Sequence, residues 1–226
     1  MKKLLKCFCF SAIFILFACA PKPKVAPPPF FEKTELSLEE IIVKAGKDID
    51  VLKAIADIRI EKNKEPFGFV NAAILVKRPG WVHMRIYKMG MLVRDFVIKD
   101  AELYVLSGKG GKNLKDLGSE FYNAVFWWDR MRDGLMRSEK DNYIIRTENK
   151  EIHIDRATLL PVKQTVSSSA ALVEIAYDAP REQGNGFWYQ SEIQILVGEY
   201  KFNVKLKKLL RNPSLGELDF RTPAEG

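Results

Sequence analysis

Most of the chain beyond residue 50 alternates between apolar and polar residues. The clearest example is segment 200–210, in which the apolar residues Tyr200, Phe202, Val204 and Leu206 alternate with lysine and asparagine. A period of two places apolar side chains on one face of a β-strand. Ten further segments have a similar pattern and predict strands near residues 52–61, 67–77, 81–88, 91–99, 102–107, 143–147, 151–155, 161–166, 172–177 and 187–197. The short turns between many of them predict antiparallel hairpins.

Two segments have the period of a helix instead. Ser37 and Glu40 form a capping box, and Gly46 predicts the C-terminal end of the first helix. The second segment, 117–131, carries apolar residues at helical spacing: Leu117, Phe121, Ala124, Val125 and Trp128. The aromatic pair at 126–127 extends this apolar surface almost around the helix, which predicts burial on several sides.

Eleven strands with one apolar face cannot be covered by two helices. The sheet is therefore expected to curl into a full or partial antiparallel barrel with the helices at its mouth. The side chains expected to point inward are Val70, Ile74, Val82, Met84, Ile86, Phe96, Ile98, Ile193, Ile195, Phe202 and Val204. A barrel of this size can be filled by side chains or can enclose a ligand cavity. Alternation alone favours a filled core and does not separate it from an apolar pocket.

The amino terminus has the layout of an export signal. Lys2, Lys3 and Lys6 precede an apolar run at 7–17, which closes on the sequence Leu-Phe-Ala-Cys at 16–19. A charged start, a short apolar run and small residues at a cleavage point are typical of a secretory signal peptide. The final cysteine resembles the lipobox of bacterial lipoproteins, which implies cleavage before Cys19 and lipid attachment to it. A transmembrane anchor is the alternative, but the run is well short of the roughly 20 residues that cross a bilayer.

This interpretation divides the chain into three parts. Residues 1–18 are the predicted signal peptide, 19–36 the lipidated cysteine with a proline-rich tether, and 37–222 a single barrel domain. The proline-rich sequence at 20–29 favours an extended, semi-rigid conformation. All three cysteines lie within the first 19 residues, so no disulfide framework and no cysteine metal site are predicted.

Neither the charge distribution nor any catalytic motif points to a further function. The chain has 36 basic and 29 acidic residues, and three basic ones lie in the signal, leaving a net charge of +4 (33 against 29). These charges are interspersed, so no nucleic-acid partner is predicted. The two histidines, His83 and His153, lie on polar faces of strands, and no HExxH, GxSxG or SxxK motif occurs. The sequence therefore predicts no enzyme, catalytic residue, metal site or cofactor, although a site assembled from distant residues would escape detection by motif.

The order of these features resembles the LolA/LolB family of lipoprotein-sorting proteins, and most of all its LolB outer-membrane receptors. The resemblance covers the lipobox, the tether, the capped helix, the strand meander, the second helix and a final run of strands. That run ends in Leu210-Arg211-Asn212-Pro213 and Leu218-Asp219-Phe220. The best local matches are Lys77-Arg78-Pro79-Gly80 and Lys88-Met89-Gly90. It is a resemblance of pattern over most of the chain rather than of one diagnostic motif.

The resemblance implies a mainly β fold, a single unclosed antiparallel β-barrel of about eleven strands lidded by two α-helices. It also implies a hydrophobic cavity for the acyl chains of lipoproteins. LolB proteins carry a Pro-Leu-Gly turn whose leucine acts on the membrane, and the match places Met89 at this leucine and Lys88 at the proline. Met89, Gly90 and Met91 are therefore the expected membrane-contact loop. A LolA-like periplasmic carrier is an implied partner.

These features predict an outer-membrane-anchored lipoprotein that faces the periplasm. It is expected to bind acyl chains of lipoproteins, or other lipids, and to pass them to the membrane. Ala20 follows the expected lipidated cysteine, where enteric bacteria use aspartate to retain lipoproteins in the inner membrane; this favours the outer membrane. The alternative is an envelope sensor or scaffold lipoprotein on the same fold, which a filled barrel with a large exposed apolar patch would favour.

Overall fold

The computed structural model describes residues 27–28, 30–31, 35–46, 48–109, 112–167, 172–184, 186–216 and 218–222. The expected signal peptide at 1–18, Cys19 and most of the expected tether lie outside the described residues. Within the described part of the chain, no helix combines the length and the apolar character needed to cross a membrane.

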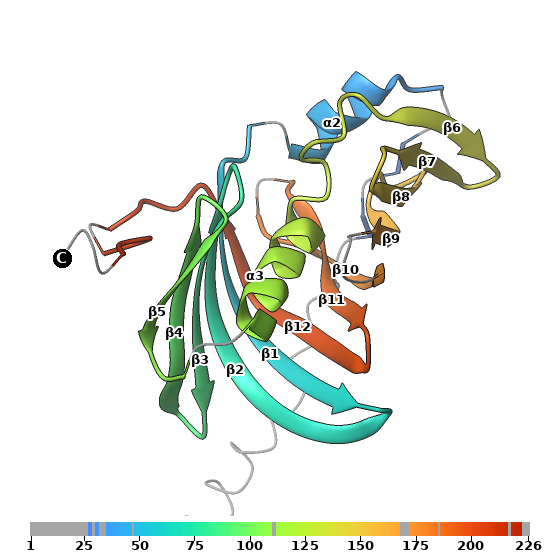
Figure 1. The fold of residues 1–226 in the computed structure, drawn as a ribbon. Coiled ribbons are helices and arrows are strands. Elements are labelled where there is room, and N and C mark those ends of the chain that lie inside the picture. The colour runs from blue at the N-terminus through green and yellow to red at the C-terminus, as the bar shows by residue number, and fades with distance from the viewer. Residues whose placement is uncertain are drawn as a thin grey trace, which may run out of the picture.

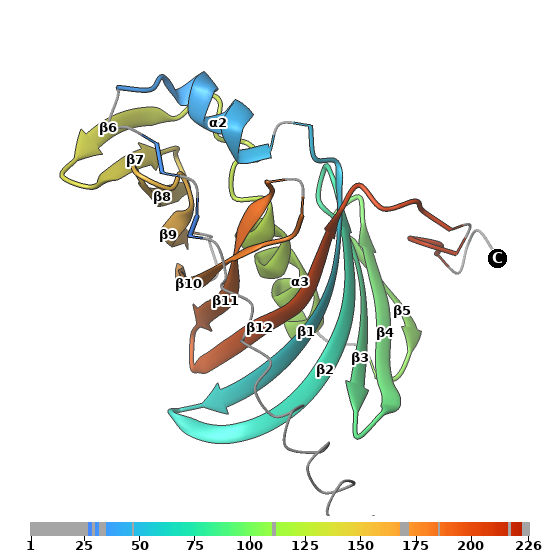
Figure 2. The same ribbon diagram turned by 180° about the vertical axis from the view of Figure 1, so that it is seen from behind.

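Twelve strands form one continuous sheet in the order β5-β4-β3-β2-β1-β12-β11-β10-β9-β8-β7-β6 (Figure 1). Their bounds are β1 Val51–Lys62, β2 Glu65–Lys77, β3 Trp81–Lys88, β4 Met91–Lys99, β5 Glu102–Ser107, β6 Leu135–Glu139, β7 Asn142–Arg146, β8 Lys150–Asp155, β9 Pro161–Ser167, β10 Leu172–Glu182, β11 Trp188–Val197 and β12 Tyr200–Arg211. Every neighbouring pair is antiparallel. The sheet curls strongly, and among the described strands β5 and β6 end it without pairing with each other (Figure 2). The predicted mainly β, unclosed antiparallel fold is confirmed, with one strand more than the sequence predicts.

Two helices accompany the sheet in the described part of the chain. α2 (Leu38–Gly46) begins after Ser37, whose Oγ accepts a hydrogen bond from the Glu40 N–H at 3.3 Å. In return, Glu40 Oε2 accepts a bond from the Ser37 N–H at 2.7 Å, which completes the predicted capping box. α3 (Lys112–Val125) crosses the concave side of the sheet and contacts β3 and β4 (Figure 1).

The bounds of α3 differ from the predicted helix at 117–131. The helix begins five residues earlier, in a mainly polar segment whose one apolar residue is Leu114, and it ends at Val125. Residues 126–130 form turns in which the Asp129 N–H donates to the Phe126 carbonyl at 2.9 Å, and Arg130 has a left-handed backbone (φ 59°). Phe126 and the two following tryptophans are nevertheless buried. The apolar run at 126–128 therefore marks burial rather than helix.

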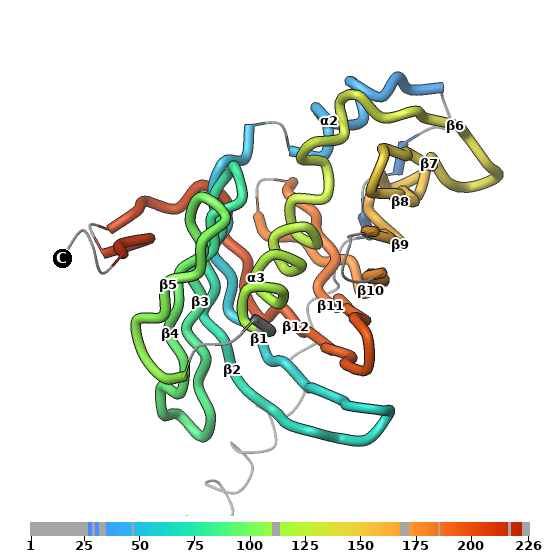
Figure 3. Tube along the Cα trace, viewed as in Figure 1, coloured from blue at the N-terminus to red at the C-terminus, as the bar shows by residue number. Residues whose placement is uncertain are grey.

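The main core lies between the concave face of the sheet and α3. All eleven residues predicted to point inward belong to it: nine are buried, and Val70 and Phe202 pack against it while partly buried. A second, smaller cluster lies on the opposite face, where the segment after β12 runs to the outer side of β3–β5 (Figure 3). There Phe220 packs beside Trp81 of β3, with ring centroids 5.7 Å apart. Phe220 thus covers part of the outer face at this end of the sheet.

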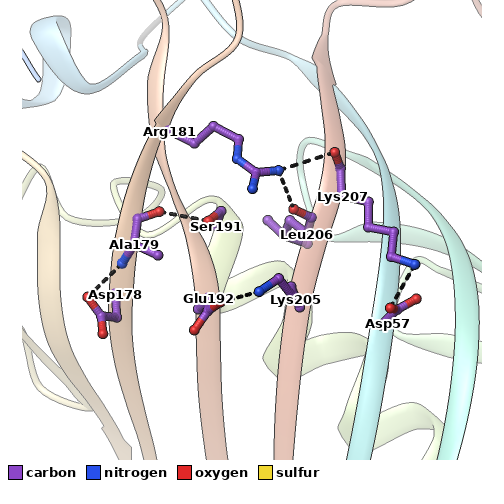
Figure 4. A network of polar contacts seen from close by, with 9 residues as sticks. All are labelled: Asp57, Asp178, Ala179, Arg181, Ser191, Glu192, Lys205, Leu206 and Lys207. Atoms are coloured by element: carbon purple, nitrogen blue, oxygen red, sulfur yellow. Dashed lines mark hydrogen bonds and ion pairs between the residues drawn. The ribbon is translucent and has the colours of Figure 1, made fainter. Parts of the chain in front are cut away.

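Polar contacts brace the wall of the sheet where β12 is irregular (Figure 4). The register between β1 and β12 shifts at Ile55/Ala56, so that Lys207 is the extra residue of β12. Arg181 of β10 donates through Nη1 to the carbonyls of Leu206 and Lys207 at 3.3 and 3.4 Å. Lys207 Nζ lies 2.8 Å from Asp57 Oδ2 on β1, and this hydrogen bond lowers the pKa of Asp57. The contacts therefore join β10, β12 and β1 at the irregularity.

Candidate functional site

An apolar pocket of about 610 Å³ opens at the end of the sheet where the β1–β2 and β11–β12 hairpins turn. Its apolar lining comes from β1, β2, β3, β11, β12 and α3: Ile58, Ile60, Phe67, Val70, Ile86, Leu114, Leu117, Val197, Tyr200 and Phe202. Arg94, Asp116 and Glu199 also line it. Sites for small molecules are typically concave, mostly apolar and about 300–1,000 Å³ in volume. The pocket has this character.

Strand register explains why the lining side chains share one face. Residues directly opposite one another on neighbouring strands point to the same side of a sheet. Ile58 of β1 lies opposite Val70 of β2 on one side and Val204 of β12 on the other. Ile60 lies opposite Phe202. A continuous apolar surface therefore runs from the core outward to the pocket.

Aromatic side chains form the outer part of the pocket. The register between β1 and β2 shifts at Ile60/Glu61, which leaves Phe67 as the extra residue of β2. The Phe67 ring lies 6.2 Å from Tyr200 at an interplanar angle of 78°, and Tyr200 stacks on Phe202 with centroids 6.2 Å apart. Because a bulge re-aims a side chain, Phe67 both lines the pocket and remains 63% exposed.

α3 separates the pocket from the packed core. Leu114 and Leu117 of its first half line the pocket, whereas Phe121, one turn further, is buried in the core. At this point Gly118 lies against β4, because a Cβ on Gly118 would be only 2.6 Å from Ile98 Cδ1. The position of the helix therefore decides which inward-facing side chains are packed and which face the pocket.

The eleven predicted inward residues fall into three groups. Val70, Ile86 and Phe202 line the 610 Å³ pocket. Ile193 lines a smaller pocket of about 130 Å³, beside Trp127. The remaining seven are packed in the core cluster: Ile74, Val82, Met84, Phe96, Ile98, Ile195 and Val204. The pocket thus occupies the outer ends of the strands, and residues nearer the middle of the sheet fill the core.

Two of the lining residues, Phe67 and Arg94, are missing from the set of side chains that the sequence predicts to point inward. Phe67 is the extra residue of a bulge, and a second bulge at Val93 resets the alternation of β4. Beyond this bulge, Arg94 has the same parity as Phe96 and Ile98, which both point inward. That shared parity is the sequence signal that could have placed an arginine on the inner face.

Three charged residues lie at the pocket. Glu199 is engaged outside it, since its carboxylate lies 3.3 Å from Lys62 Nζ and accepts a hydrogen bond from Asn63 Nδ2 at 3.3 Å. The Glu199 contact raises the pKa of Lys62. Arg94 donates through Nη1 to the carbonyl of Val93 at 2.6 Å. Asp116 reaches the pocket from α3.

The β3–β4 hairpin exposes apolar side chains at its tip. Met89 is 88% exposed and Met91 66% exposed. Met89 and Gly90 both have positive φ, 53° and 78°, as in the type I′ turns that usually carry Asn-Gly. Methionine is uncommon in the left-handed conformation. Met89 is thus an apolar residue in an unfavourable backbone conformation, and its side chain is almost fully exposed to solvent. Packing against the rest of the protein does not explain its presence at this position.

Buried titratable groups elsewhere have structural partners. Lys150 Nζ donates to the Trp127 carbonyl at 2.8 Å, and burial lowers its pKa to about 8. Tyr177 donates to the Ala124 carbonyl at 3.1 Å, and burial raises the pKa of this phenol. His83 lies on the polar face of β3, as predicted, yet it is buried beside Phe220 and lies 2.8 Å from Asp95 Oδ1. Among the described residues, no group of three or more His, Cys, Asp or Glu side chains could hold a metal ion.

Solved structures share this architecture. The chain is similar to a LolA superfamily protein from Nitrosomonas europaea, with a TM-score of 0.60 and 12% identity over 83% of this chain and 99% of that one. The fold is LolA-like. It is also similar to a DUF1329 family protein from Desulfovibrio piger, with a TM-score of 0.55 and 13% identity over 84% of this chain and 98% of that one. The sequence matches no family model and no curated protein. At this identity the similarity establishes the LolA-type fold, and the function has to be argued from the pocket.

Proposed function

We propose that the protein binds acyl chains of lipoproteins, or of other lipids, in the 610 Å³ pocket and passes them to a membrane. The observation that carries this proposal is the pocket itself, which is mainly apolar and open at one end of an unclosed sheet. Each CH₂ group removed from water contributes about 0.8 kcal/mol. An acyl chain therefore gains enough from such a surface to bind without any covalent step.

Transfer would move the chain between two apolar environments. Its overall free energy is then small, and modest differences in affinity set the direction. The exposed tip of the β3–β4 hairpin supports a membrane contact, since contact with acyl chains would offset the exposure of Met89. This tip also occupies the position that the resemblance assigns to the Pro-Leu-Gly turn of LolB proteins, with Met89 in place of the leucine and Lys88 departing from the proline.

The proposed location is the periplasmic face of the outer membrane. Its support is the lipobox at 16–19, the proline-rich sequence that follows and Ala20 after the expected lipidated cysteine. A LolA-like periplasmic carrier is the proposed donor of cargo. In this arrangement the protein receives an acylated ligand at its pocket and releases it at the end of the sheet that carries the β3–β4 hairpin tip.

Binding of a neutral fluorescent acylglycerol tests the proposal. The protein for this experiment is the chain from residue 19 onward carrying Cys19→Ser, which keeps every described residue. Val70→Trp fills the pocket and is expected to weaken binding by at least about tenfold, or 1.4 kcal/mol. Phe69→Trp is the matched control, because Phe69 lies opposite Arg59 on the outer face of the same strand. Saturable binding that both variants retain equally, or no binding by the parent, would contradict the proposal.

A further inference from the structure

Arg94 is the one cationic side chain among the described residues that line the apolar pocket. It lies opposite Ile86 in the β3–β4 register, two residues from the buried Phe96, and so points to the inner face. A charged group among apolar walls loses hydration unless it has a partner. Its presence there therefore needs an explanation.

The chain holds this guanidinium in place. A bulge at Val93 turns Arg94 inward, and Arg94 Nη1 donates to the Val93 carbonyl at 2.6 Å. Gly108, at the end of β5, has φ +85° and leaves room for the side chain. A Cβ on Gly108 would lie 2.9 Å from both Arg94 Cδ and Arg94 Nη1. Backbone geometry and the missing side chain at 108 thus fix where Arg94 lies.

Within the part of the chain that the structure describes, Arg94 is free of ion pairs with carboxylates and can therefore bind an anion. Among the described residues, no ion pair joins it to a carboxylate, and its one hydrogen bond uses a single donor of five. Glu199 is engaged by Lys62. Asp116 lines the same pocket from α3 and is the residue that could oppose an anion there.

We propose that Arg94 binds the anionic head group, a carboxylate or a phosphate, of a lipid whose acyl chain occupies the pocket. The inference rests on the proposed function and names the lipid class. A guanidinium binds either anion through paired hydrogen bonds, and charge-assisted bonds are about twice as strong as neutral ones. Apolar walls on the inner side and solvent at the mouth orient such an amphiphile with its head at Arg94.

Three ligands with the same oleoyl chain test this: oleic acid, oleoyl lysophosphatidic acid and monooleoylglycerol. Each displaces the neutral acyl probe from the chain described above, at pH 8. The parent is expected to bind the two anionic lipids about tenfold more tightly than the neutral one. Arg94→Gln is expected to remove this preference while leaving the affinity for monooleoylglycerol within about twofold.

The matched control is Arg85→Gln. Arg85 lies on the outer face of β3, opposite Asp95 and 3.6 Å from its Oδ2, so its loss is expected to keep the preference. Arg94→Lys keeps the positive charge and is expected to recover part of it. A measurement on the parent alone is independent of folding defects in the variants: the preference should shrink as ionic strength rises.

The outcomes separate the two proposals. Equal affinity of the parent for all three lipids, or a preference that survives Arg94→Gln, overturns the role of Arg94 and leaves acyl binding standing. Displacement of oleic acid by millimolar inorganic phosphate would show a site for free anions and would also overturn it. Failure of every ligand, and of the probe, to bind the parent overturns the proposed function and this inference with it.

Discussion

Gly118 of α3 lies directly against Ile98 of β4. A Cβ on Gly118 would lie 2.6 Å from Ile98 Cδ1 and 3.4 Å from Phe96 Cε2. Glycine in a helix interior costs about 1 kcal/mol relative to alanine, so close packing explains its presence here. The contact sets how closely α3 approaches the sheet. The position of α3 in turn determines which inward-facing side chains lie in the core and which line the pocket.

Replacing this glycine should destabilise the protein. Gly118→Val is expected to lower the free energy of unfolding by about 1–3 kcal/mol, because the added methyl groups overpack the contact with Ile98. Lys115→Val, at an exposed position of the same helix, is the matched control. Urea denaturation measures both. A Gly118→Val variant at least as stable as the parent would show that α3 does not depend on this approach.

The buried lysine predicts a pH dependence. The pKa of Lys150 is about 8 in the folded protein, lowered by burial from an ordinary value of 10.5. Between these values the unfolded chain binds more protons, so this group makes the free energy of unfolding rise with pH. Below pH 8 its contribution is constant.

Lys150→Met isolates this effect. From pH 8 to pH 10 the parent is expected to gain stability relative to Lys150→Met, as followed by urea denaturation at each pH. Lys115→Met, which removes an exposed lysine, is the control for the substitution itself. A difference between parent and Lys150→Met that stays the same from pH 7 to pH 10 would argue against a depressed pKa.

Met89 should matter for delivery and not for folding. Met89→Glu is expected to leave stability and acyl binding nearly unchanged while blocking transfer of a bound acyl lipid to liposomes. Leu135→Glu is the control, since Leu135 is 81% exposed at the other end of the sheet, on β6 (Figure 1). Equal transfer by Met89→Glu and the parent would exclude a membrane role for the hairpin tip.

A second substitution separates turn geometry from membrane contact. Met89→Asn places a residue that favours positive φ at this position and creates the common Asn-Gly turn. The variant is expected to be at least as stable as the parent in urea, yet impaired in transfer. A less stable variant with normal transfer would mean that Met89 serves the fold.

Lipidation is tested at Cys19. Cys19→Ser is expected to leave a protein that is either soluble or uncleaved, because the lipobox then lacks its acceptor thiol. Fractionation of cells and the mass of the isolated chain measure attachment and processing. Unchanged cleavage and membrane attachment in this variant would contradict the interpretation of residues 16–19 as a lipobox.

Alternation predicts most of this fold from the sequence because most strands bury one face and expose the other. β6 escapes prediction because Leu135 and Met136 are its only apolar residues and most of the strand is exposed. The capping box predicts the start of α2 because its hydrogen bonds are local. The end of α3 is missed because burial of Trp127 and Trp128 depends on tertiary packing and not on helix formation.

The pocket is harder to predict than the sheet. Val70 and Ile74 have the same parity on β2, yet Val70 lines the pocket while Ile74 lies in the core. The difference arises from the position of α3, which neighbouring residues in the sequence do not determine. A bulge hides Phe67, because it resets the alternation within β2, whereas Arg94 keeps the parity of Phe96 beyond the bulge of β4.

The most direct test of the account is mass spectrometry of lipid extracted from the purified chain from residue 19 onward. The account predicts that the parent and Phe69→Trp each carry acyl lipid, close to one molecule per chain, and that Val70→Trp carries much less. A parent that contains no lipid, or a Val70→Trp variant that contains as much as the parent, would contradict acyl binding in this pocket.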